Sequence, residues 1–198
     1  MGEWVVFDYG GVLCTDQPAA DKAALLRAAG VRDPDPFWAR YWELRRPYDR
    51  GDLDAAAYWA ELLGRDLDAA AVAAIDAIDV ASFSHPYEGT IRLVERLAGS
   101  TGLALLSNCP PSMATVIEGL SWTDLIPHRF YSCRLGEIKP HPEAYRAVLA
   151  ALGADPADVT FVDDRPANVA GAAAVGMRAL LFTDPATLAA DLHVQGDT

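Results

Sequence analysis

Cysteine and histidine are scarce in this chain of 198 residues. The few that occur are spread along the sequence without the short spacings of zinc ligands: Cys14, Cys109, Cys133, His85, His128, His141 and His193. An odd number of cysteines without regular spacing excludes a disulfide framework, so we expect reduced thiols. The scattered histidines likewise give no support to a transition-metal site.

Basic residues and long apolar runs are also few. The chain has 16 Lys and Arg against 28 Asp and Glu, a formal charge of −12, and such a field repels nucleic acids and anionic membrane surfaces. No stretch has the roughly 18 consecutive apolar residues of a membrane span, and the N-terminus has no basic region followed by an apolar segment and cleavage site. We therefore expect a cytoplasmic monomer or homodimer with neither nucleic-acid nor membrane partners.

One carboxylate follows an apolar run close to the N-terminus. The run Trp4 to Phe7 leads into Asp8, which is followed by the glycines Gly10 and Gly11. A short continuous apolar run is typical of a strand in a parallel sheet, and such sheets place their ligands at the carboxyl ends of the strands. Asp8 is therefore expected at a binding edge, in the position of a nucleophile.

Three later segments have the same layout. Their apolar runs lead to Ser107 and Asn108, to Lys139, and to Asp163 and Asp164, so the same sheet edge gains a hydroxyl, an ammonium group and a carboxylate pair. From about residue 87 strands and helices alternate, which predicts a doubly wound α/β core. The expected strands are 103–106, 130–132, 159–162 and 178–182, and the expected helices are 88–98, 111–120, 142–152, 166–175 and 185–192.

Between the first and second strands the pattern is purely helical. Residues 16–84 predict four helices, at 18–29, 36–46, 54–63 and 68–77, with acidic starts and glycine stops that fit ordinary capping. We therefore expect two parts: an α/β core of residues 1–15 and 85–198, and a four-helix insert of residues 16–84.

These pieces together resemble the four motifs of the haloacid dehalogenase superfamily of aspartate-nucleophile hydrolases. The motifs read Phe7-Asp8-Tyr9-Gly10-Gly11-Val12-Leu13, Leu106-Ser107-Asn108, Gly136-Glu137-Ile138-Lys139-Pro140 and Phe161-Val162-Asp163-Asp164-Arg165-Pro166-Ala167-Asn168. The resemblance covers the whole chain and implies a Rossmann-like core with the helical insert as a small cap. The first motif is similar to a subgroup that includes sugar-phosphate phosphatases and the N-terminal domains of epoxide hydrolases.

The resemblance implies a Mg²⁺-dependent phosphatase that acts on a small phosphorylated metabolite through an aspartyl-phosphate. Phosphoryl transfer to a carboxylate needs an attacking oxygen, groups that hold and neutralise the phosphate oxygens, and a cation between the two anions. The implied catalytic residues are Asp8 and Lys139, the implied phosphate-binding residues are Ser107, Asn108 and Gly11, and the implied Mg²⁺ ligands are Asp8, the Gly10 carbonyl, Asp163 and Asp164.

One departure from the family pattern concerns proton transfer. Phosphatases of this superfamily usually have a second aspartate where this chain has Gly10, and loss of a positioned acid/base typically costs on the order of 10²- to 10⁴-fold in rate. Cys14 and Asp16, which are nearby in sequence, are the candidates to substitute for it. Asn168 also stands where many members carry an acidic residue that supports the metal.

The departure at Gly10 leaves two alternatives open. A 2-haloacid dehalogenase also uses an aspartate nucleophile and needs neither that acid nor a metal, but the Asp163 and Asp164 pair would repel a haloacid carboxylate. A binding or regulatory protein that keeps the pocket without turnover is the other alternative.

The segment Phe37 to Arg50 is the most distinctive part of the insert. Its aromatic residues recur at helical spacing, which favours a packing face, while its four arginines could bind an anionic group or stack on a ring. Tyr58 and Trp59 could extend such a binding surface.

Overall fold

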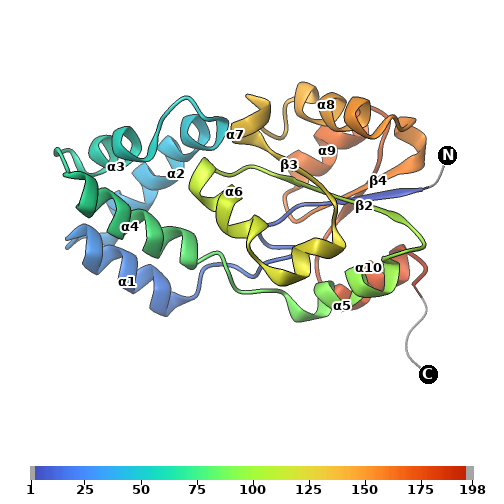
Figure 1. Cartoon of the computed structure of the whole chain (residues 1–198), viewed down its shortest axis with the longest axis horizontal. Helices are drawn as coiled ribbons and strands as arrows, with labels where there is room; N and C mark the ends of the chain where they lie inside the picture. Colours follow the sequence, from blue (N-terminus) through green and yellow to red (C-terminus); the bar gives the residue numbers. More distant parts are fainter. Residues whose placement is uncertain (1–2, 195–198) are drawn as a thin grey trace.

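The computed structural model describes residues 3–194, and over this range a five-stranded parallel sheet forms the centre of the molecule (Figure 1). The strand order is β3-β2-β1-β4-β5, so the first strand of the chain lies in the middle. All four neighbouring pairs are parallel. The predicted doubly wound α/β class is confirmed. The strands are β1 (Trp4–Phe7), β2 (Gly102–Ser107), β3 (His128–Tyr131), β4 (Val159–Asp163) and β5 (Arg178–Leu181).

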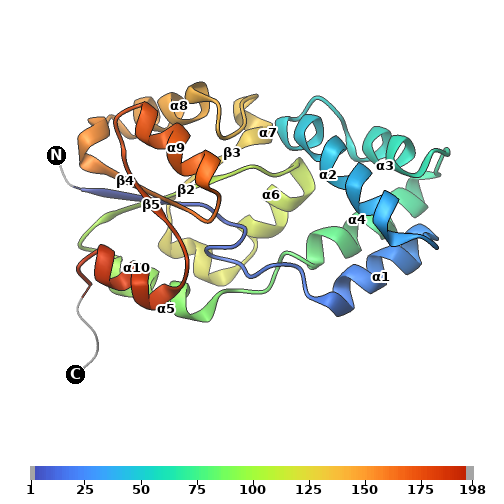
Figure 2. The same ribbon diagram turned by 180° about the vertical axis from the view of Figure 1, so that it is seen from behind.

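Helices cover both faces of the sheet. Val5 and Phe7 of β1 pack on the side of α5 (Glu88–Leu97), α6 (Pro111–Glu118) and α10 (Pro185–Asp191). Val6 points to the opposite face and packs with α8 (Pro142–Leu152) and α9 (Pro166–Ala174). Figure 2 shows α5 and α10 on one face and α8 and α9 on the other. This alternation of side chains follows from the pleat of the strand, and it buries β1 on both faces.

The four helices between β1 and α5 lie beyond the carboxyl ends of the strands (Figure 1). We call them the helical insert. They bury their own apolar cluster, which includes Leu25, Tyr41, Trp59 and Ile75. The helices are α1 (Ala19–Ala29), α2 (Pro34–Arg50), α3 (Ala55–Leu63) and α4 (Ala69–Ala81), while the short elements of the rest of the chain are η1 (Ser121–Leu125), α7 (Ser132–Leu135) and η2 (Pro156–Asp158).

Helix α2 is longer than the sequence predicts. The predicted helix ends at Arg46, directly before Pro47, but the helix continues through Pro47 to Arg50 and is capped by Gly51, whose φ of +87° suits glycine. Pro47 removes one backbone hydrogen-bond donor, but its backbone dihedral angles remain helical in this last turn of α2. The extension places Tyr48 and Asp49 on the helix, facing inward.

The suggested binding surface at Tyr58 and Trp59 is wrong, because both side chains are fully buried in the insert. Trp42, by contrast, keeps 46% of its surface exposed. Within residues 3–194 the structure has no helix that is both long and apolar enough to cross a membrane.

Candidate active site

Asp8 lies at the carboxyl end of β1. Its N–H donates to the carbonyl of Val162 at 2.8 Å, which extends the pairing of β1 with β4 by one residue. Its Oδ1 accepts from the N–H of Tyr9 at 2.7 Å. The residue is only 7% exposed, and its side chain lines a cavity of about 280 Å³, which is bounded by the sheet edge and the helical insert. Ser107, at the end of the neighbouring β2, lines the same cavity.

Lys139 connects two of the carboxylates. Its Nζ lies 2.6 Å from Oδ1 of Asp8 and 2.8 Å from Oδ2 of Asp163, and the residue is buried. The amide of Asn108 fixes the backbone of Lys139: Nδ2 donates to its carbonyl and Oδ1 accepts from its N–H, both at 2.9 Å. Because one hydrogen of Nδ2 and the Oδ1 of Asn108 are engaged, a phosphate contact by Asn108 is left to its backbone N–H and the second hydrogen of Nδ2.

Asp163 is fully buried, and both of its oxygens accept hydrogen bonds. Oδ1 accepts from the N–H of Arg165 at 2.8 Å, Oδ2 accepts from Lys139, and Nδ2 of Asn168 lies 3.0 Å from each oxygen. The asparagine at position 168 therefore donates to Asp163, where an acidic side chain would repel it. Asp163 in turn holds the ammonium group of Lys139 beside Asp8.

Asp164 has an oxygen without a partner. Its Oδ1 is buried and makes no hydrogen bond to any of residues 3–194. Ligand oxygens of Asp8, Asp163 and Asp164 lie within 4.8 Å of one another. An orphaned carboxylate oxygen beside two more carboxylates is a donor set that suits a hard divalent cation.

Gly11 lies directly against the carboxylate of Asp164, which fits there because glycine has no Cβ. Gly11 has a φ of +77°, and a Cβ there would lie 2.7 Å from Cγ of Asp164. The N–H of Gly11 donates to the carbonyl of Cys14 at 2.8 Å. The predicted phosphate contact of Gly11 is therefore not available through this N–H, and the requirement for glycine comes from the close approach of Asp164.

The charges of this cluster do not balance. Burial and then repulsion by Asp163 raise the pKa of Asp8 to about 7, although Lys139 opposes the shift. Burial and repulsion by Asp163 also raise the pKa of Asp164. Burial alone would lower the pKa of Lys139, but attraction by Asp8 and Asp163 outweighs it and raises that pKa. Three carboxylates thus face one ammonium group that stays charged, an excess of negative charge that favours a bound cation.

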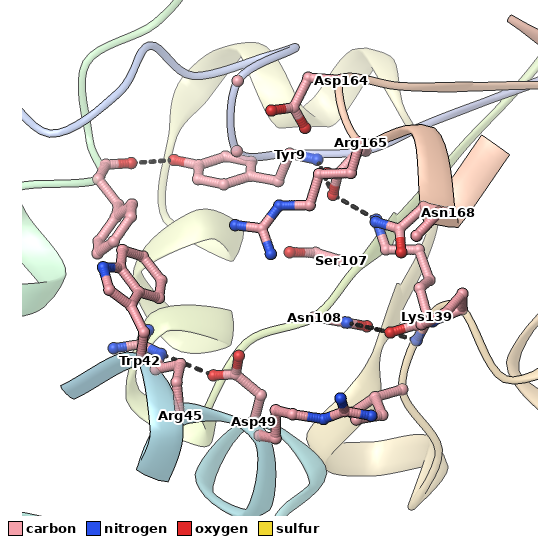
Figure 3. A pocket seen from close by; sticks show the side chains of 18 of the residues that line it. Tyr9, Trp42, Arg45, Asp49, Ser107, Asn108, Lys139, Asp164, Arg165 and Asn168 are labelled. Carbon is pink, nitrogen blue, oxygen red and sulfur yellow. Dashed lines mark hydrogen bonds and ion pairs between the residues drawn. The ribbon is translucent and has the colours of Figure 1, made fainter. Parts of the chain in front are cut away.

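The helical insert supplies the other side of the cavity. Figure 3 shows Trp42, Arg45 and Asp49 of α2 on the side of the view away from Tyr9 and Asp164. The sequence did not single out Asp49 or Arg165 as cavity residues. Arg45 and Asp49 are four residues apart and form an ion pair on one face of the helix. This spacing is a sequence signal that would have identified Asp49.

Cys14 and Asp16, the two residues considered as substitutes for the absent acid/base, lie in different surroundings. Cys14 is buried outside the cavity lining, and its Sγ donates to the carbonyl of Phe83 at 2.9 Å. Burial raises its pKa to about 11. Asp16 lines the cavity but is exposed to solvent. Cys14 is therefore excluded as a proton donor to a bound ligand.

Comparison with known proteins gives consistent matches. A family model described as haloacid dehalogenase-like hydrolase matches residues 3–176. Flavin mononucleotide hydrolase 1 of Arabidopsis thaliana is 47% identical over 77 residues, which are 39% of this chain but only 29% of that protein. The sesquiterpene phosphatase of Aspergillus oryzae is 28% identical over 181 residues, 90% of this chain and 89% of that protein.

A solved structure shares the whole architecture. It is a haloacid dehalogenase family enzyme of Bacteroides thetaiotaomicron, in complex with magnesium and inorganic phosphate. It superposes with a TM-score of 0.75 at 18% identity and covers 93% of this chain and 96% of its own. The family model spans most of the residues that build the sheet and its carboxyl edge, so this chain belongs to the haloacid dehalogenase-like hydrolases.

Proposed function

We propose that the chain is a Mg²⁺-dependent phosphatase of small phosphomonoesters that works through an aspartyl-phosphate on Asp8. One observation carries the proposal: the Asp8 carboxylate, the Lys139 ammonium group and the unpartnered oxygen of Asp164 lie together at one cavity. The phosphatase names of the relatives support the same reaction class. The proposal includes residues 16–84 as a cap that closes the cavity, in a cytoplasmic protein.

The residues have distinct roles in this proposal. Asp8 attacks phosphorus, Lys139 neutralises charge on the phosphate oxygens, and Ser107 with the backbone N–H of Asn108 holds those oxygens. Asp8, Asp164 and the Gly10 carbonyl would hold Mg²⁺, which when bound reduces the repulsion between carboxylate and phosphate. Since both oxygens of Asp163 accept hydrogen bonds, we assign Asp163 to the positioning of Lys139 beside this site.

Phosphate release tests the proposal directly. The intact chain is incubated with p-nitrophenyl phosphate and a panel of sugar phosphates, with Mg²⁺ and with a chelator. We expect turnover that stops with the chelator and returns with added Mg²⁺. Halide release from 2-chloropropionate without metal would instead make the protein a dehalogenase, and phosphate binding with no turnover of any substrate would make it a binding protein.

Substitution of Gly11 by alanine is expected to weaken Mg²⁺ binding. The new Cβ would lie 2.7 Å from Cγ of Asp164 and would push that carboxylate away. Displacing a group that orients metal ligands typically lowers metal affinity about 10- to 100-fold. The measurement is the Mg²⁺ concentration that gives half-maximal activity, with Mg²⁺ binding measured by calorimetry.

Gly30→Ala is the matched control, because Gly30 has a φ of +72° and its Cβ would meet nothing within 4 Å. It carries the same backbone strain without touching Asp164. Equal Mg²⁺ affinities of the two variants would contradict the role assigned to Asp164.

A further inference from the structure

A phosphatase of this kind needs a proton donor for its leaving group, and Gly10 supplies none. The ionisable side chains that line the cavity are Asp8, Tyr9, Asp16, Arg45, Arg46, Asp49, Lys139, Asp164 and Arg165. Arginines stay protonated. The Tyr9 hydroxyl donates to the carbonyl of Phe83, and burial raises its pKa far above the usual range. With Asp8, Lys139 and Asp164 already assigned, Asp16 and Asp49 remain.

Asp49 is held in one orientation. Its Oδ1 accepts from Nε of Arg45 at 2.8 Å, and Nη1 of Arg45 donates to Asp79 and to the Tyr41 hydroxyl. Its other oxygen, Oδ2, has no hydrogen-bond partner within residues 3–194, and the carboxylate points into the cavity (Figure 3). The side chain of Asp16, by contrast, is exposed and makes no hydrogen bond in this range.

The backbone of Asp49 is fixed to the core beside the phosphate-binding residues. The hydroxyl of Ser132 donates to the carbonyl of Asp49 and accepts from the N–H of Cys109 at 2.9 Å. Cys109 directly follows Ser107 and Asn108 in the chain. Ser132 is fully buried, so this connection between α2 and the end of β2 is shielded from water. Asp49 therefore faces the position of a bound phosphate from the side of the insert.

This side is the one where a leaving group departs. In phosphoryl transfer the attacking and leaving oxygens lie roughly in line through phosphorus. Asp8 attacks from the sheet edge, so the leaving oxygen points toward the helical insert, where α2 carries Asp49. Asp16 lies before α1, the first helix of the insert, at the exposed part of the lining.

The pKa of Asp49 suits a residue that donates and accepts a proton. Burial raises its pKa to about 6, against the attraction of Arg45 on its own helix. Asp79 on α4 adds to the rise and Arg165, next to α9, opposes it. A carboxyl with a pKa near the working pH exchanges protons most effectively.

We propose that Asp49 replaces the acid/base residue that is absent at Gly10; this inference rests on the proposed phosphatase activity. As the Asp8 oxygen bonds to phosphorus and the bond from phosphorus to the leaving oxygen breaks, Asp49 gives its proton to that oxygen and becomes a carboxylate. In the second step a water oxygen bonds to phosphorus, Asp49 takes a proton from this water, and the bond to Asp8 breaks. Phosphate leaves and Asp49 is again protonated.

The test is the dependence on leaving group in Asp49→Asn. Asparagine still offers an oxygen to Arg45 but has no acidic proton. A p-nitrophenolate leaves readily without protonation, whereas the alkoxide of glycerol phosphate does not. At pH 6 with Mg²⁺, we expect kcat/KM for glycerol phosphate to fall about 10²- to 10³-fold, and kcat/KM for p-nitrophenyl phosphate to fall less than about tenfold. Asp16→Asn tests the other carboxylate that remains in the lining, and it should leave the ratio of the two kcat/KM values at the wild-type value.

Each other result has a definite meaning. An equal loss on both substrates would overturn the inference, because it would show that Asp49 only positions Arg45 or the fold. No loss on glycerol phosphate, or a selective loss in Asp16→Asn in place of Asp49→Asn, would overturn it as well. A wild-type chain that hydrolyses p-nitrophenyl phosphate in these assays keeps the proposed function whatever the variants do, whereas one that hydrolyses neither substrate refutes the function and the inference together.

Discussion

Asp8→Asn is expected to lower kcat for every phosphomonoester by about 10⁴-fold or more, which is the scale of loss when a nucleophile is removed. The asparagine keeps the shape of the side chain and an oxygen that accepts from Tyr9 and Lys139. It cannot form the acyl phosphate, so catalysis by the remaining groups is limited to holding the phosphate. The measurement is steady-state phosphate release with Mg²⁺, together with trapping of a phosphorylated protein that only the wild-type chain forms.

The controls separate chemistry from binding. Asp66→Asn removes an exposed carboxylate outside the cavity lining and should keep wild-type turnover. Asp8→Asn should still bind inorganic phosphate, because Ser107 and Lys139 remain and one negative charge has gone. If Asp8→Asn retains a tenth or more of wild-type turnover, attack by Asp8 is not the mechanism.

The sheet edge could be predicted because Asp8, Ser107, Asp163 and Asp164 end a strand or follow it directly, whereas Lys139 follows β3 only after the short helix α7. An apolar run such as Val159 to Val162 is expected as a buried strand of a parallel sheet, and the end of this strand fixes the position of Asp163 and Asp164. The order of the four segments then brings Asp8, Ser107 and Lys139 to the same edge. The sequence pattern does not show which carboxylate oxygens already accept hydrogen bonds. Asp163 accepts from three donors, while the buried Oδ1 of Asp164 has no partner among the described residues.

The side of the cavity formed by the insert could not be predicted in the same way. The distance along the chain between Asp49 and Ser132 says nothing of their contact, which depends on how the insert packs over the core. Helix α2 also continues past its predicted end at Arg46, through Pro47, although proline ordinarily ends a helix. Tyr58 and Trp59 of α3 proved to be core residues because α3 packs that face against α2.

Asp79→Ala is expected to lower the free energy of unfolding by about 3–5 kcal/mol, the scale of loss when one partner of a buried ion pair is removed. Asp79 is fully buried on α4, where Oδ2 accepts from Nη1 of Arg45 at 2.9 Å and Oδ1 accepts from the Tyr41 hydroxyl at 2.7 Å. Alanine leaves the guanidinium of Arg45 with Asp49 as its one carboxylate partner among the described residues. Urea unfolding followed by circular dichroism gives the loss of stability.

The comparison that isolates burial is Glu61→Ala. Glu61 pairs with Arg40 of α2 at 2.9 Å, but both side chains are more than 40% exposed, so removing this pair should cost under about 1 kcal/mol. Similar losses in the two variants would mean that the Asp79 pair contributes no more than a surface ion pair. Because Arg45 also holds Asp49, a lasting displacement of Arg45 in Asp79→Ala should lower turnover of glycerol phosphate more than turnover of p-nitrophenyl phosphate. The same contacts that stabilise the insert would thus set the geometry of proton transfer.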